Sequence, residues 1–293
     1  MSTYSNSPIL VTGAAGQLGR AIITELKARG ATDITAGSRD PAKVADLGVK
    51  TARVDFDDPS SLDAAFSGIE RLMLISTDVL GVPGKRKEQH LAAVAAAKRA
   101  GVRHVVYTSM PSPEPGAQIP FAPDHLGTEE AIKESGMDYT ILRHNWYFEN
   151  TLMGMPQAIA SGAVYTSAAQ GGLAQVARDD LAAADAGALL TETGKHTYDL
   201  SGPQALTRDQ EIAVFNRVLG TKINAVHLDD AALTGGLTAA GLPDFLIGLI
   251  VGADASIRTG RMGKVTDAVE RLSGRKPRSL EDWLSANREL FAA

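Results

Sequence analysis

The stretch LVTGAAGQLGRAII, residues 10–23, carries the spacing in this chain that is best suited to binding chemistry. Gly13, Gly16 and Gly19 recur every three residues between an apolar run and a helix-like pattern. A turn of this kind directs backbone N–H groups and the positive end of a helix toward one point. That arrangement suits a pyrophosphate, so the glycine turn predicts a dinucleotide site. A purely structural turn is the alternative, but a flanking strand and helix favour binding.

The residues after the next two predicted strands indicate which dinucleotide is bound. NAD sites place an acidic residue about 20 positions after the turn, where it accepts the ribose hydroxyl. Twenty positions after Gly19 the chain instead has Arg39, with Lys43 one turn later. A guanidinium can hold a 2′-phosphate with forked, charge-assisted hydrogen bonds, so we expect NADPH, with a solvated surface arginine as the alternative. Asp55 and Phe56 are predicted to border the adenine, unless Asp55 only caps a turn.

Alternating strand-like and helix-like segments must position this turn. Strands are predicted at PILVTG, DITAGSR, TARVDF, RLMLIS, VRHVVYTS and DYTILRHN, with helical patterns between them. This order predicts an α/β fold with a Rossmann-type, doubly wound parallel sheet. The alternation weakens after about residue 145. We therefore expect an NADP-binding domain over 1–150 and a smaller C-terminal substrate-binding lobe over most of 151–293, with 195–202 returning to the main sheet.

Composition narrows the classes of function. The chain of 293 residues has a net charge of -5 and no cysteine, which argues against a nucleic-acid partner and excludes disulfides and thiolate catalysis. No apolar run approaches the roughly 18 residues of a membrane span, and the polar N-terminus lacks the order of a signal peptide. The six histidines lack metal-binding spacing. We expect a cytoplasmic protein with no metal and no membrane partner, and a homodimer is compatible with the sequence.

Several stretches resemble the atypical short-chain dehydrogenase/reductase superfamily and its NmrA-like branch. The turn has the superfamily's T-G-x-x-G-x-x-G spacing, and ITAGSRDPAK, AAKRAGVRHVVYTS, DYTILRHNWYFEN and the tail RKPRSLEDWL resemble the branch. Within it, the chain is most similar to the type-two NADPH:quinone oxidoreductases and the triphenylmethane dye reductases. The resemblance implies cofactor contacts along the turn and, at the nicotinamide, from two strand ends. These residues are Thr12, Gly13, Gly16, Gln17, Leu18, Gly19, Ser76, Thr77, Thr108 and Ser109.

The resemblance also implies an aromatic pocket for the acceptor. It places Asn145, Trp146 and Tyr147 at the border of this pocket. Phe121 and Phe148 would extend the aromatic wall, although some of these rings belong to the core in the alternative interpretation. Side chains alternate along a strand, so they cannot all face one side. A flat, conjugated acceptor is the small-molecule partner that such a wall predicts.

The proton donor that many short-chain dehydrogenases use is missing. None of the six tyrosines has a lysine four residues later, and His125 and Glu129 stand at the two matching places in DHLGTEEAIK. A ketone reduced by hydride becomes a strongly basic alkoxide, whereas a quinone becomes a phenolate-type anion with a pKa near 10. A cationic triarylmethane dye needs no proton. We therefore expect conjugated acceptors, with His125 as proton donor or polariser, and a structural histidine as the alternative.

Two functions stay open on the sequence alone. The first is an oxidoreductase that transfers hydride from NADPH to a quinone or a similar acceptor. The second is a non-catalytic NADP(H) sensor that binds a protein partner, because the NmrA-like branch also contains regulators. The missing tyrosine–lysine pair is compatible with both. The segment NWYFEN favours the reductase, since it offers an aromatic acceptor site.

Overall fold

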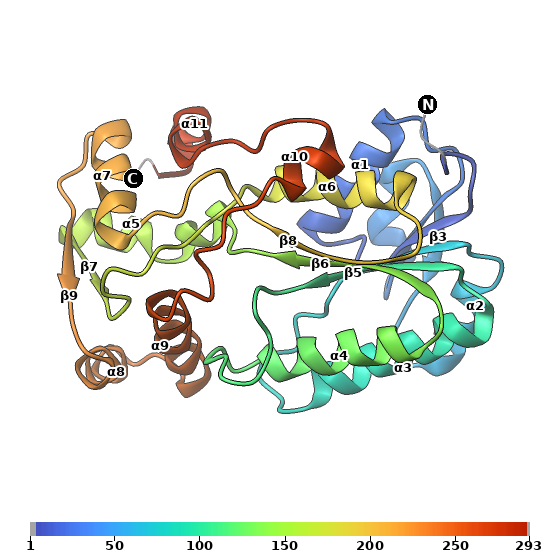
Figure 1. Cartoon of the computed structure of the whole chain (residues 1–293), viewed down its shortest axis with the longest axis horizontal. Helices are drawn as coiled ribbons and strands as arrows, with labels where there is room; N and C mark the ends of the chain where they lie inside the picture. Colours follow the sequence, from blue (N-terminus) through green and yellow to red (C-terminus); the bar gives the residue numbers. More distant parts are fainter. Residues whose placement is uncertain (1–3, 292–293) are drawn as a thin grey trace.

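A seven-stranded parallel sheet forms the centre of the computed structural model, which describes residues 4–291 (Figure 1). The strand order is β3-β2-β1-β4-β5-β6-β8. The strands are β1 (Ile9–Val11), β2 (Ile34–Ser38), β3 (Lys50–Arg53), β4 (Arg71–Leu74), β5 (His104–Ser109), β6 (Asp138–His144) and β8 (Lys195–Leu200). The order reverses between β1 and β4, because the chain runs outward to β3 and then crosses back. This confirms the predicted Rossmann-type, doubly wound parallel sheet.

Helices cover both faces of this sheet (Figure 1). On one face lie α1 (Gln17–Ala28), α6 (Arg178–Thr191) and α10 (Ala268–Ser273). On the other lie α2 (Pro59–Phe66), α3 (Lys85–Ala100) and α4 (Ala122–Glu134). Every residue of β1, β4 and β5 is buried, as expected for central strands of a parallel sheet that is covered on both sides.

A smaller group of elements lies at one end of the sheet (Figure 1). It contains α5 (Met155–Ser161), α7 (Arg208–Leu219), α8 (Asp230–Ala239), α9 (Asp244–Arg258), α11 (Leu280–Ala286) and a second parallel sheet of β7 (Ala163–Thr166) and β9 (Asn224–His227). Short 3-10 helices occupy Pro41–Leu47, Phe148–Met153 and Arg288–Phe291. By contrast α6, β8 and α10, which come from the same half of the chain, lie with the main sheet. Strand β8 falls within 195–202 and pairs in parallel with β6.

Helix starts follow local capping chemistry. Asp58 accepts hydrogen bonds from the N–H groups of Ser60 and Ser61, and Pro59 opens α2, as the sequence indicates. Thr207 begins α7 with a reciprocal capping box to Gln210. Helix α1 begins differently, because its N-cap is Gly16, which has no side chain with which to cap. Its first N–H groups are therefore open to an external acceptor.

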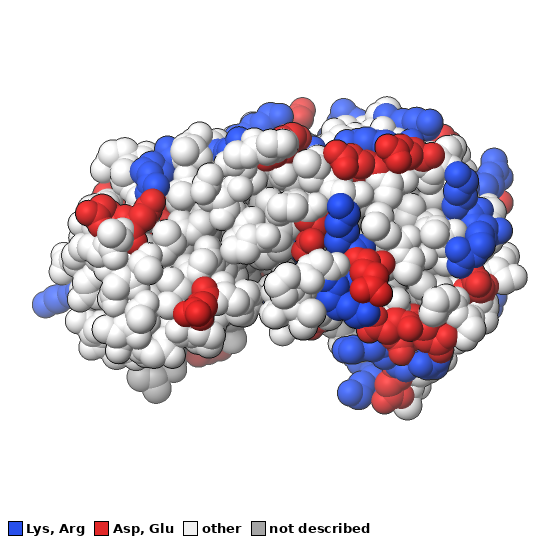
Figure 2. Space-filling model, turned by 90° about the horizontal axis from the view of Figure 1, so that it is seen from below, with Lys and Arg blue, Asp and Glu red and all other residues white. Residues whose placement is uncertain are grey.

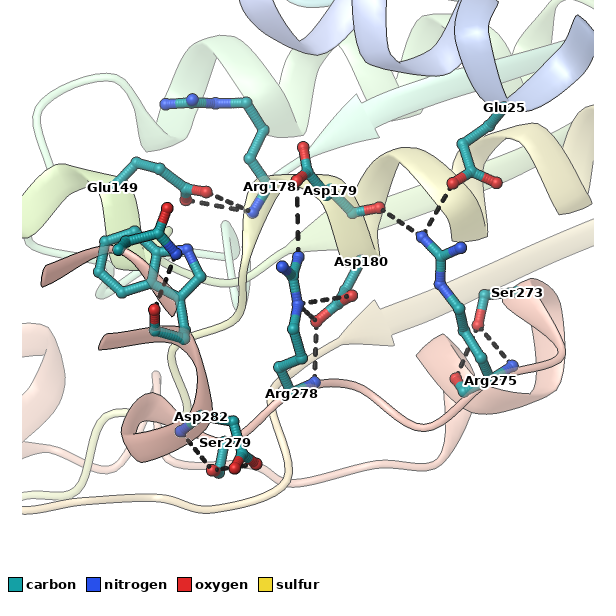
Figure 3. Close-up of polar contacts among 12 residues, drawn as sticks. Glu25, Glu149, Arg178, Asp179, Asp180, Ser273, Arg275, Arg278, Ser279 and Asp282 are labelled. Atoms are coloured by element: carbon teal, nitrogen blue, oxygen red, sulfur yellow. Dashed lines mark hydrogen bonds and ion pairs between the residues drawn. The ribbon is translucent and has the colours of Figure 1, made fainter. Parts of the chain in front are cut away.

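The C-terminal tail ties the start of α6 in place (Figure 3). The backbone N–H of Arg278 donates to a carboxylate oxygen of Asp180 at 2.8 Å, and its side-chain Nε lies 3.2 Å from the same group. Arg275 donates to Glu25 of α1 at 2.8 Å and to the carbonyl oxygen of Asp179 at 3.3 Å. The tail therefore joins the helices that cover one face of the sheet.

Charge is unevenly distributed on the surface. In the view of Figure 2, charged side chains gather over the half that holds α2, α3 and α4, while the half over α8 and α9 is largely uncharged. In this view the uncharged surface belongs to the smaller group of elements and not to the helices that cover the sheet.

Within residues 4–291, none of the helices combines the length and the apolar character needed to cross a membrane.

Candidate functional site

The glycine turn between β1 and α1 has the geometry of a phosphate cradle. Gly13 has a φ of 61°, a left-handed conformation that residues with a side chain rarely adopt. A Cβ atom at Gly19 would lie 2.5 Å from the carbonyl oxygen of Gly13, so only glycine lets α1 pack this closely on the turn. Thr12 is buried, and its Oγ1 accepts the N–H of Ile75 at 2.9 Å. This bond ties the turn to the end of β4.

A cavity of about 330 Å³ opens beside this turn, a size typical of small-molecule sites. It lies at the carboxyl ends of the first strands, beside the point where the strand order reverses, where open α/β sheets bind their ligands. Eight of the predicted cofactor residues line it: Gly13, Gly16, Arg39, Lys43, Asp55, Phe56, Ser76 and Thr77. The other lining residues are Ala15, Ser38, Asp40, Val54, Ile75, Asp78, Val79 and Gln89. The residues present thus fit a dinucleotide.

The remaining predicted cofactor residues do not line the cavity: Thr12, Gln17, Leu18, Gly19, Thr108 and Ser109. Thr108 is buried, and its Oγ1 accepts the N–H of Ser76 at 2.8 Å. Ser109 donates to the buried carboxylate of Glu129 at 2.7 Å. These hydroxyls hold strand ends in position behind the cavity wall, and a direct contact with a cofactor stays a prediction for them.

The two cationic side chains predicted to favour NADPH over NADH, Arg39 and Lys43, lie at the cavity. Arg39 and Lys43 both have exposed side chains and line it, and within residues 4–291 neither forms an ion pair with a carboxylate side chain. Asp40 stands next to them, but its carboxylate accepts the N–H of Ala42 at 3.1 Å and caps the following short helix. The free charge at this end of the cavity is therefore positive.

His125 lies under the surface and not in the cavity lining. Its side chain is 3% exposed, and its Nδ1 lies 2.9 Å from the hydroxyl of Tyr107, with His90 on the other side of that hydroxyl at 3.5 Å. Burial, together with the charge of Arg86, lowers the pKa of His125 well below its usual value. The imidazole is therefore neutral at neutral pH, and its role as donor or polariser stays a prediction.

Glu129, at the place of the usual lysine, is a buried carboxylate. It accepts hydrogen bonds from Nε and Nη2 of Arg143 at 2.9 and 2.8 Å, in addition to the one from Ser109. Burial opposes its ionisation, but these bonds outweigh it and lower the pKa of the Glu129 carboxyl. Lys133, one turn further, adds an ion pair at 3.2 Å. This position fastens α4 to β6 and supplies no cation.

The predicted acceptor residues, together with Phe148 of the aromatic wall, fall in four different environments. Phe121 and Trp146 pack against the same apolar cluster, beside α9. Asn145 is buried, and its amide donates to the carbonyl oxygen of Met262 at 3.0 Å while its oxygen accepts the N–H of Trp146. Tyr147 is partly exposed and packs against the cluster under α1 and α6. Phe148 belongs to the core with Trp283, as the alternative interpretation of the aromatic wall held.

Sequence reasoning missed three buried polar residues around this region. Arg86 is 5% exposed and donates from Nε to the carbonyl oxygen of Thr77 at 2.7 Å, while its Nη1 has no partner among the described residues. His144 and Asp185 are also buried, and they contact each other at 2.8 Å. The signal for Asp185 was visible: it is a lone carboxylate in LAAADAGALL, where the surrounding residues are small and apolar.

Comparison with known proteins places these features in a family. Residues 13–192 match the protein family described as NAD(P)H-binding. Quinone oxidoreductase 2 of Escherichia coli is 33% identical over 283 residues, which cover 94% of this chain and 97% of that protein. A crystal structure of an NADPH-dependent quinone oxidoreductase of Escherichia coli with NADPH superposes with a TM-score of 0.88 at 32% identity, covering 96% of this chain and 99% of that one.

A second enzyme is similarly related. The crystal structure of Citrobacter triphenylmethane reductase with NADP(H) has a TM-score of 0.84 and 33% identity, covering 93% of this chain and 97% of that one. The negative transcriptional regulator NmrA shares only the fold, at 17% identity and a TM-score of 0.74. The resemblance found in the sequence is thereby confirmed. The chain belongs to the NAD(P)H-binding family that includes quinone oxidoreductase 2 and triphenylmethane reductase.

Proposed function

We propose that this protein is an NADPH-dependent oxidoreductase that transfers hydride to a quinone or to a similar conjugated, electron-poor acceptor. The observation that carries the proposal is the cavity beside the glycine turn, which combines a phosphate cradle with two unpaired cations at one end. Similarity over nearly the whole chain to a quinone oxidoreductase and a dye reductase supports the same reaction. The regulator NmrA supports only the fold.

Each part of the cavity has a proposed task toward the cofactor. The glycine turn and the open N-terminus of α1 hold the pyrophosphate. Arg39 and Lys43 hold the 2′-phosphate, and Asp55 and Phe56 border the adenine. Ser76 and Thr77, together with the hydroxyls behind them, face the nicotinamide. When bound, the reduced nicotinamide supplies the hydride, and the protein contributes orientation and a shielded site.

The acceptor is proposed to lie against the aromatic side chains beside α9. Phe121 and Trp146 pack on one cluster there, and the guanidinium carbon of Arg86 lies 5.0 Å from the centre of the Phe121 ring. Acceptors whose products are resonance-stabilised suit this site, because the chain has no Tyr-x-x-x-Lys pair to protonate an alkoxide.

Replacing Arg39 is expected to remove most of the preference for NADPH over NADH. A charge-assisted hydrogen bond contributes about 1.5–3 kcal/mol, which corresponds to a ratio of roughly 10- to 150-fold. Dissociation constants of both cofactors, measured with wild type and Arg39→Ala, test this. Arg103→Ala is the matched control, since that arginine is exposed and lies outside the cavity. An unchanged ratio in Arg39→Ala would remove Arg39 from the site.

A panel of acceptors at fixed NADPH tests the reaction itself. We expect turnover of benzoquinones and naphthoquinones, a smaller response to cationic dyes and no turnover of aliphatic ketones, because their alkoxide products need a strong proton donor. Absorbance of the reduced nicotinamide is followed against a blank without protein. Fast ketone reduction that disappears in His125→Ala would overturn the proposal in favour of a conventional dehydrogenase. Tight NADPH binding without any turnover would favour the sensor.

A further inference from the structure

Asp185, His144 and Tyr147 form a continuous series of polar contacts that begins at a buried carboxyl group and ends at a hydroxyl group. The carboxylate oxygen Oδ1 of Asp185 lies 2.8 Å from Nε2 of His144, and Nδ1 of His144 lies 3.1 Å from the hydroxyl of Tyr147. Asp185 lies in α6, His144 ends β6, and Tyr147 follows three residues later. The order carboxylate, imidazole, hydroxyl is the one in which an imidazole carries protons to and from a reacting oxygen.

The interior end of these three side chains is a buried carboxyl group. Asp185 is fully buried, and its Oδ2 has no hydrogen-bond partner among residues 4–291. Burial raises the pKa of the Asp185 carboxyl, and the His144 imidazole at 2.8 Å is the group with which this carboxyl can share a proton. Whether this pair is carboxylate with imidazolium or carboxylic acid with imidazole, an N–H at Nδ1 can point at the Tyr147 oxygen.

Tyr147 stands beside the glycine turn. The guanidinium carbon of Arg178 lies 5.7 Å from the centre of the Tyr147 ring, and the same guanidinium donates to the side-chain oxygen of Gln17, the first residue of α1. The carboxylate of Glu149 accepts the backbone N–H of Arg178 at 3.1 Å (Figure 3). Tyr147 therefore lies close to the start of α1, directly after the acceptor candidate Trp146 in the chain, and its hydroxyl faces His144.

From this geometry we infer that Tyr147 is the proton donor to the reduced acceptor, supplied through His144 and Asp185. The inference rests on the proposed function, since it assigns a task within that reaction. Tyr147 is then a catalytic residue, and His144 and Asp185 are positioning residues that act through it. The arrangement contains no cation like the lysine of the usual pair, so it suits the weakly basic oxyanion of a reduced quinone and not the alkoxide of a reduced ketone.

The step is balanced in protons and electrons. The acceptor gains a hydride, with its two electrons, from the nicotinamide, which is oxidised, and one acceptor oxygen becomes an anion. The O–H bond of Tyr147 breaks as its proton passes to this oxygen, and the proton at Nδ1 of His144 passes to the Tyr147 oxygen. The pair of His144 and Asp185 ends with one proton fewer and regains it from water after the product leaves.

The surrounding charges suit a hydroxyl that stays protonated. Burial and the nearby Asp185 raise the pKa of Tyr147, and Glu149 acts in the same direction, whereas Arg178 and Arg86 oppose it. His125 on α4 is also near enough for His144 to contribute to the lowering of the His125 pKa. These are the charged and titratable groups that determine the pH range of the relay.

The test compares two acceptors that differ in their need for a proton. Reduction of a quinone creates an oxyanion, whereas hydride transfer to a cationic triarylmethane dye such as malachite green gives a neutral product without any proton. We expect Tyr147→Phe to lower kcat for quinone reduction about 10²-fold, the low end of general acid catalysis, and to leave dye reduction unchanged. Tyr165→Phe, at an exposed position on β7, is the matched control and should change neither.

Equal losses for the quinone and the dye would overturn the relay, because Tyr147 would then act only on the fold or on positioning. No loss for the quinone would overturn it as well. If wild type reduces the quinone but not the dye, the solvent isotope effect on the kcat of quinone reduction is the deciding measurement. We expect kcat to be lower in D2O than in H2O for wild type and equal in the two solvents for Tyr147→Phe. Equal values in wild type would refute the relay. Failure of the proposed function looks different, since wild type would then bind NADPH and reduce no acceptor.

Asp185→Asn tests the relay through the pH dependence of quinone kcat, which the loss of a purely structural contact would not change. The amide keeps the shape and removes the carboxylate, so the pair holds its shared proton less tightly. The fall in quinone kcat toward high pH should therefore begin at lower pH than in wild type, while NADPH binding stays the same. The relay requires an N–H at Nδ1 of His144 in the free protein, which nitrogen NMR detects as a signal that is lost in His144→Gln. A deprotonated Nδ1 in wild type would contradict the relay without any activity measurement.

Discussion

Gly16→Val is expected to weaken NADPH binding at least about 100-fold, a loss of roughly 2.7 kcal/mol, while the fold survives. Gly16 lines the cavity and caps α1 with an extended backbone of φ -80° and ψ 165°, which valine also adopts. Its Cβ would meet only the carbonyl oxygen of Gly13, at 3.3 Å. The remaining methyl groups would occupy the space in which backbone N–H groups of the turn meet the pyrophosphate.

Binding is measured by titrating the fluorescence of NADPH, and folding by thermal denaturation without cofactor. Gly154→Val is the matched control, because a Cβ there meets nothing within 4 Å and the residue lies outside the cavity. Gly19→Val should behave differently and lose stability, since its Cβ would lie 2.8 Å from Cα of Ala14. Wild-type affinity in Gly16→Val would show that the phosphates lie elsewhere.

Lowering the pH from 7 to 5 is expected to reduce the free energy of unfolding by on the order of 5 kcal/mol. Burial lowers the pKa of His90 and of His104 to about 3, and that of His125 well below its ordinary value. In the unfolded chain each imidazole binds a proton near pH 6.5. The unfolded state therefore takes up more protons as the pH falls below 6.5, and each histidine removes about 2 kcal/mol by pH 5.

Urea denaturation at several pH values tests this, with the midpoint and slope compared at pH 7 and 5. His104→Gln should lower the pH dependence by about one third, because it removes one of the three buried imidazoles. His196→Gln, at an exposed position on β8, should leave the dependence unchanged. Equal stability at pH 7 and 5 in wild type would mean that these histidines are protonated in the folded protein.

Local patterns in the sequence determined the fold class and predicted residues that line one end of the cavity. The glycine spacing, the cap at Asp58 and Pro59 and the alternation of strands and helices each depend on neighbours within one turn or one strand. The position of Arg39 near the glycine turn could also be predicted locally. One βαβ unit sets the number of residues between the glycine turn and the end of the second strand, where Arg39 follows. These predictions needed no long-range contacts, and the strand order and the lining of the cavity agree with them.

The proton chemistry was decided only by the tertiary structure. His125 has the same local sequence whether it faces a cavity or contacts the buried hydroxyl of Tyr107, and the packing of α4 on β5 placed it against that hydroxyl. Asp185 and His144 are 41 residues apart and meet because α6 covers the sheet at the end of β6. The local sequence pattern does not predict this contact, because the contact depends on how the whole of α6 packs on strands that come earlier in the chain. The sequence therefore predicted which residues form the cofactor cavity. The packing of α6 on the sheet decided which side chains come together to form the proposed proton relay.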